Sequence, residues 1–183
     1  MRNTLLLVVS LVALLASSSA GQTRLAPLTV VTDVDYQRYG GMWFEISRLP
    51  NPRNRCATDV TSSYTLRDDG LLEVRNSCRK DNGDVLEATG VARRASGHPP
   101  SSLQIRYGPA FLGFLPGVWI DYQIIDLGDQ YQYAVVGTPD RSSLRILART
   151  PRMDPSLYRE LVERARAQGF DVDALVLTTH PWT

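Results

Sequence analysis

Few side chains in this sequence are of the types that carry out catalysis or bind metals. The chain contains two histidines, His98 and His180, and two cysteines, Cys56 and Cys78. They do not have the spacing of a metal-ligand set, and the sequence has no C-x-x-C motif. The serines lack the G-x-S-x-G context of a nucleophile elbow, and the carboxylates are scattered through turns. We therefore expect a non-enzymatic protein with no metal and no cofactor.

The beginning of the chain has the pattern of a secretory signal peptide. Arg2 supplies a positive start, an apolar run follows that only Ser10 interrupts, and small residues end at Ala20. The run is shorter than the roughly 20 apolar residues that span a bilayer, although an uncleaved anchor is the alternative. Because no cysteine follows it, as a bacterial lipoprotein would require, we expect a soluble periplasmic or secreted protein, with residues 1–20 as the signal peptide.

Export to an oxidising compartment favours a disulfide between Cys56 and Cys78 over two free thiols. If Leu66 and Leu71 flank a hairpin turn, the two cysteines are three positions out of register. A β-bulge, or a frayed start of the strand before Val60, would close this gap.

The length and charge of the chain fit one domain with a neutral surface. Removing residues 1–20 leaves about 160 residues, enough for a sizeable core. The sequence has 20 basic and 19 acidic residues, which gives no reason to expect nucleic acid as a partner. We assign residues 21–33 to a leader and residues 34–183 to the folded domain.

Short strand-like runs separated by turn signals fill most of this domain, which indicates an all-β fold. The eight expected strands are Met42–Leu49, Val60–Leu66, Leu71–Cys78, Val85–Arg94, Leu103–Tyr107, Trp119–Asp126, Tyr131–Gly137 and Leu144–Arg149. Mostly short connections favour an up-and-down antiparallel order. Asp154 and Pro155 then begin a helix that Gly169 ends, and residues 174–178 form a short ninth strand. The expected architecture is an eight-stranded antiparallel up-and-down barrel with one C-terminal α-helix and a short ninth strand.

Three segments resemble the lipocalin family, and in particular the bacterial outer-membrane lipocalins related to apolipoprotein D. Residues 39–50 resemble the G-x-W signature with its usual continuation, although Phe44 replaces the common tyrosine. Residues 126–136 are similar to the second conserved block, of whose usual T-D-Y core only Asp129 keeps the acidic residue. Residues 146–151 closely match the third block, and the expected helix follows them.

The resemblance implies roles for three signature residues and one departure. Gly41 turns the chain into the first strand, and Trp43 plugs the narrow end of the barrel. Arg149 is expected to stack on Trp43 in a cation–π contact, the alternative being an ordinary core tryptophan and a solvated arginine. Arg145 lies where relatives often have tryptophan, which weakens any ligand preference borrowed from them.

The resemblance also implies that the barrel binds and transports or stores a small hydrophobic ligand, such as a fatty acid or lysophospholipid. The candidate lining residues are Tyr64, Val74, Asn76, Ala88, Tyr107, Trp119, Tyr122 and Tyr133. For each aromatic residue among them, the alternative is that it only packs in the core. The apolar loop Phe111–Leu115 could act as a ligand gate, a membrane contact or a dimer contact. The chain is expected to be a monomer or homodimer. The alternative functions are an enzyme that acts on a lipid in the same barrel, and a protein-interaction module with a filled barrel.

Overall fold

The structure is a computed structural model that describes residues 25–52, 56–109, 115 and 117–181. The expected signal peptide lies outside these residues, as does the expected apolar loop apart from Leu115. None of the described helices is both long enough and apolar enough to cross a membrane.

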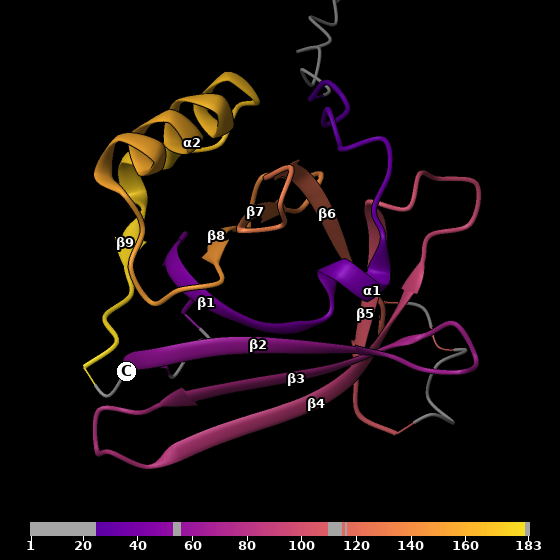
Figure 1. Cartoon of the computed structure of the whole chain (residues 1–183), viewed down its shortest axis with the longest axis horizontal. Coiled ribbons are helices and arrows are strands. Elements are labelled where there is room, and N and C mark those ends of the chain that lie inside the picture. Colours follow the sequence, from indigo (N-terminus) through magenta and orange to yellow (C-terminus); the bar gives the residue numbers. More distant parts are fainter. Residues whose placement is uncertain (1–24, 53–55, 110–114, 116, 182–183) are drawn as a thin grey trace, which may run out of the picture.

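Eight strands form a closed antiparallel barrel, as the sequence predicts (Figure 1). They are β1 (Gly41–Arg48), β2 (Thr58–Leu66), β3 (Leu72–Arg79), β4 (Val85–Arg94), β5 (Ser102–Tyr107), β6 (Ile120–Leu127), β7 (Tyr133–Gly137) and β8 (Leu144–Ala148). Each strand pairs with its neighbours in the sequence, and β1 pairs with both β2 and β8 to close the barrel. The observed boundaries differ from the expected ones by one or two residues at most strand ends.

The ninth strand, β9 (Val176–Leu177), lies outside the barrel against the second half of β1. This half is available because β2 pairs with β1 only from Gly41 to Phe44. Past that point the tail occupies the place beside β1, and Thr179 bridges to Thr58 of β2.

Helix α2 (Pro155–Ala167) covers one side of the barrel, away from the layer of β2, β3 and β4 (Figure 1). Asp154 caps it by accepting hydrogen bonds from the backbone N–H groups of Ser156 and Leu157. Leu161 and Ala165 on its inner face pack with the outward apolar residues of β1, β6, β7 and β8. A second, separate apolar cluster, which includes Trp43 near the start of β1, fills the barrel interior at that end. The apolar residues of these strands therefore face two ways, into the barrel and toward the helix.

The described part of the expected leader is anchored to this framework. Leu28 is buried in the cluster beneath α2, and Val31 donates a backbone hydrogen bond to Ile124 of β6. Asp35 then caps a short helix, α1 (Tyr36–Tyr39), which the sequence analysis did not predict. This helix leads directly into β1.

The expected disulfide joins Cys56 to Cys78, with Cα atoms 5.5 Å apart. The register of β2 against β3 shifts between Thr58 and Thr61, where Asp59 adopts a positive φ of 53°. This irregularity, together with the position of Cys56 before β2, closes the gap that the sequence register left. The bond therefore ties the start of β2 to the end of β3.

Candidate functional site

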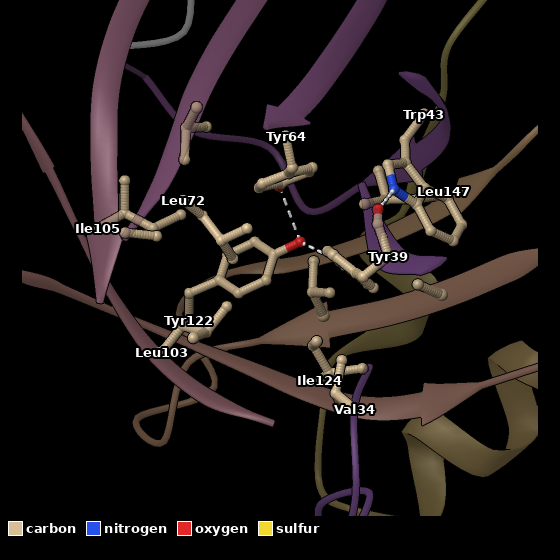
Figure 2. Packing of buried hydrophobic residues seen from close by; sticks show 14 residues of the cluster. Val34, Tyr39, Trp43, Tyr64, Leu72, Leu103, Ile105, Tyr122, Ile124 and Leu147 are labelled. Carbon is tan, nitrogen blue, oxygen red and sulfur yellow. Dashed lines mark hydrogen bonds between the residues drawn. The ribbon is translucent and has the colours of Figure 1, made fainter. Parts of the chain in front are cut away.

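Trp43 and Arg149 close the narrow end of the barrel. Trp43 is fully buried, and its indole N–H donates to the carbonyl of Tyr39 at 2.8 Å (Figure 2). The guanidinium carbon of Arg149 lies 3.8 Å from the centre of the Trp43 ring, which is the stacking that the resemblance implied. Arg149 also donates to the carbonyls of Arg38, Met42, Tyr39 and Tyr131, so that one side chain joins α1, β1 and the turn before β7.

Gly41 adopts the backbone conformation that begins β1 at the narrow end of the barrel. Its φ is +86°, a region that favours glycine, and a Cβ there would lie 3.4 Å from Nη1 of Arg149. The positive φ at this position turns the chain into β1 beside the guanidinium of Arg149.

Three buried tyrosines form a hydrogen-bonded layer above Trp43. The hydroxyl of Tyr122 is 2.7 Å from that of Tyr39 and 2.9 Å from that of Tyr64 (Figure 2). Burial raises the pKa of each phenol well above its usual range, so all three stay neutral. Because their hydroxyls satisfy one another, the layer forms an uncharged base beneath the open part of the interior.

Above this base the interior contains two adjoining cavities of about 300 and 330 Å³. The first, cavity A, is lined by side chains that include Tyr64, Ile105, Tyr107, Ile120, Tyr122 and Val136. The second, cavity B, is lined by side chains that include Val60, Asn76, Cys78, Leu86, Ala88 and Arg48. Asn51, Ser143 and Arg145 contact both. Asn51 follows β1 and Ser143 precedes β8, so the cavities lie toward the end of the barrel opposite Trp43. Each volume is at the lower end of the roughly 300–1,000 Å³ typical of small-molecule sites.

A group of three charged residues lines cavity B, and one of them, Arg145, also lines cavity A. Glu45, which is 1% exposed, accepts from Nε of Arg145 with one carboxylate oxygen and from Arg48 with the other, both at 2.6 Å. Thr178 of the tail also donates to it, at 2.8 Å. Burial alone would raise the pKa of Glu45, but the two arginines and these hydrogen bonds together hold it below its usual value. Glu45 therefore remains ionised at neutral pH.

A β-bulge explains why Glu45 and Arg48 share the inner face. The register of β1 against β8 shifts between Glu45 and Ser47, so residues three apart both point into the barrel. Arg145 reaches the same face from β8, where Leu144 and Ile146 on either side of it face α2.

Five of the eight expected lining residues lie on the cavities. Tyr64, Tyr107 and Tyr122 line cavity A, and Asn76 and Ala88 line cavity B. The amide nitrogen of Asn76 donates to the hydroxyl of Tyr107 at 2.6 Å, which links the two walls.

The other three expected lining residues lie elsewhere. Val74 is fully buried in the core below the cavities. Trp119 precedes β6 and stacks under the guanidinium of Arg93, 3.8 Å from its ring centre. Tyr133 packs in the cluster beneath α2, because β7 begins at Tyr133 and turns Ala134 and Val136 inward.

The sequence patterns did not predict that Glu45, Arg48 and Arg145 face the barrel interior. A signal for Glu45 exists, since it lies two positions after Trp43 and must share its face in a regular strand. Arg48 depends on the bulge, which the sequence does not reveal. Arg145 lies among four apolar residues of β8, so alternation does not show which of them face inward.

The two histidines lie away from both cavities. His180 is held outside the barrel, with Nε2 2.8 Å from the carbonyl of Glu45 and its ring edge-on to Phe44. His98 lies in the loop between β4 and β5, where its carbonyl accepts from Arg94. The described residues contain no cluster of three or more histidine, cysteine or acidic side chains that could hold a metal ion.

Comparison with known proteins identifies the family. The sequence model of the lipocalin-like domain matches residues 34–180, and the chain therefore belongs to the lipocalin family, which is known for binding small hydrophobic ligands. It is 35% identical over 153 residues to temperature-induced lipocalin-1 of Arabidopsis thaliana, covering 81% of this chain and 80% of that protein. It is 34% identical over 155 residues to the outer membrane lipoprotein Blc of Escherichia coli, covering 84% of each.

Solved structures show the same fold at lower sequence identity. Lobster apocrustacyanin A1 has a TM-score of 0.64 and 15% identity, covering 86% of this chain and 92% of the other. The cockroach allergen Per a 4 has a TM-score of 0.63 and 18% identity, covering 84% and 93%. At these identities the likeness concerns the barrel architecture alone.

Proposed function

We propose that this lipocalin binds and transports or stores a single-chain lipid, such as a fatty acid or lysophospholipid, inside its barrel. The observation that carries the proposal is the pair of adjoining cavities above the tyrosine layer, whose walls combine apolar and aromatic side chains with polar and charged ones. Burial of an acyl chain there would contribute about 0.8 kcal/mol per methylene. Binding is favoured over catalysis because the cysteines are joined to each other and neither histidine lines a cavity.

We place this function outside the cytoplasm, in the periplasm or the surrounding medium. The disulfide between Cys56 and Cys78 supports this location, since such bonds persist in oxidising compartments. The similarity to an outer membrane lipoprotein of Escherichia coli is consistent with a role in the cell envelope.

A fluorescent fatty-acid analogue should bind the purified protein saturably, and unlabelled palmitate or a lysophospholipid should displace it. Replacing Ala88, on the inner face of β4, with tryptophan fills part of cavity B and should weaken uptake at least several-fold. The matched control is Thr89→Trp, because the neighbouring side chain of the same strand faces the other way. Lack of saturable uptake of fatty acids, lysophospholipids and neutral lipids by the wild-type protein would contradict the proposal.

A further inference from the structure

Among the residues that the structure describes, Arg145 is the one charged residue that lines both cavities. The side chain of Arg145 is 23% exposed. Among the described residues, only its Nε has a hydrogen-bond partner, and the other two guanidinium nitrogens have none. The two terminal amino groups of the guanidinium are therefore available to the cavities that Arg145 lines.

Arg145 shares its carboxylate partner. Glu45 also pairs with Arg48, so one carboxylate serves two guanidinium groups, and its three donors use both of its oxygens. Asp121, which lines cavity A, accepts from the neutral Gln104 at 3.2 Å, and none of the ion pairs among the described residues joins it to Arg145. A second anion beside the guanidinium of Arg145 would therefore gain charge-assisted hydrogen bonds that the protein itself does not supply.

A planar guanidinium with two free amino groups fits one kind of ligand group particularly well. Carboxylates and phosphates accept two parallel N–H hydrogen bonds from arginine, which gives both strength and orientation. Apolar side chains stand on both sides of Arg145, including Ile105 and Val136 in cavity A and Val60 and Leu86 in cavity B. They can surround an acyl chain whose head group lies on the guanidinium.

One more polar atom supports a head group at this place. The side-chain oxygen of Asn76 in cavity B is buried and has no hydrogen-bond partner in the structure, while its nitrogen is used by Tyr107. A buried acceptor without a donor is uncommon and costs free energy that a ligand hydroxyl would offset. The glycerol of a lysophospholipid carries such a hydroxyl, whereas the ionised carboxylate of a fatty acid has no donor for this oxygen.

We propose that Arg145 is the head-group receptor of the barrel and that it selects anionic single-chain lipids, bearing a carboxylate or a phosphate, over neutral ones. This inference rests on the proposed function, because it assumes that the cavities hold a lipid. It adds the charge of the ligand, its orientation and the residue that recognises it.

The test compares three ligands that share one acyl chain: palmitate, palmitoyl lysophosphatidic acid and neutral monopalmitoylglycerol. Each displaces the same fluorescent probe from the wild-type protein and from Arg145→Met, which leaves Glu45 paired with Arg48 alone. Arg75→Met is the matched control, since Arg75 is exposed on β3 and the charge change is the same. Arg145→Gln serves as a second variant, and circular dichroism checks the folding of each protein.

The wild-type protein should bind at least one anionic ligand about tenfold or more tightly than the glyceride. Arg145→Met and Arg145→Gln should abolish this preference while leaving glyceride binding unchanged or stronger, and Arg75→Met should keep it. A stronger effect on palmitate or on lysophosphatidic acid would identify carboxylate or phosphate as the preferred group. Equal binding of all three ligands to the wild type, or a preference that survives both Arg145 variants, would overturn the inference and leave the proposed function intact. If none of the three ligands binds the wild type, both fail.

Discussion

Trp43→Ala should lower the free energy of unfolding by about 3–5 kcal/mol, which is the usual cost of removing a large buried aromatic side chain. Trp43 is fully buried, and the substitution removes its hydrogen bond to Tyr39 and the ring on which Arg149 stacks. The resulting space lies at the narrow end of the barrel, where α1, β1 and Arg149 meet. Urea unfolding followed by far-ultraviolet circular dichroism measures the change.

The adjacent residue provides the control for this prediction. Met42 is 54% exposed and lies on the other face of β1, so Met42→Ala should change stability by less than about 0.5 kcal/mol. Trp43→Phe should fall between the two, because it keeps a ring and loses the indole N–H. If Trp43→Ala lowers the free energy of unfolding no more than Met42→Ala does, Trp43 does not stabilise the narrow end of the barrel as described.

Glu45→Gln should destabilise the protein by about 2–4 kcal/mol at neutral pH. Removing one member of a buried ionic group leaves the remaining charge uncompensated, and such changes commonly cost about 3–5 kcal/mol. Here two arginines lose their shared carboxylate, but both keep some contact with solvent, which lowers the expected cost. The free energy of unfolding in urea at neutral pH tests this value. Glu87→Gln, at an exposed position of β4, is the control and should have almost no effect.

The loss caused by Glu45→Gln should also depend on pH. Because the pKa of Glu45 is lower in the folded protein than in the unfolded chain, its ionised form stabilises the fold at pH values above the unfolded pKa, about 4.3. This stabilisation disappears as the pH falls through the lower pKa of the folded state. The difference between wild type and variant should therefore narrow on acidification. A difference that grows toward acid pH, or none at neutral pH, would contradict the assigned role of Glu45.

The barrel could be predicted from the sequence because its signals are local. Turn residues separate the strands, and the N-cap Asp154 marks the start of α2. The G-x-W segment and the segment that contains Arg149 resemble lipocalin segments in the first and last strands of the barrel, and this resemblance predicts how the barrel closes. Short α1 was not predicted because it has only four residues, too few to show a helical pattern, and tertiary contacts such as those of Arg149 with Arg38 and of Tyr39 with Tyr122 hold it.

The candidate site was harder to predict because facing depends on bulges and on where strands begin. Tyr131, expected in the same strand as Tyr133, has a φ of 56° and belongs to the turn before β7. Similarly, the bulge in β1 brings Arg48 to the inner face. Shifts of this kind exchange inner and outer side chains, and the linear alternation of residue types does not show them.

We expect the interior of this lipocalin to hold a single-chain lipid in the host. The most direct measurement is gentle purification from its own host, followed by native mass spectrometry and identification of extracted lipids. A fraction of the protein should carry about one lipid molecule, and the bound lipid should be enriched in anionic single-chain species relative to the host's total lipid. Protein that is free of lipid, and that remains so after incubation with the same extract, would contradict it.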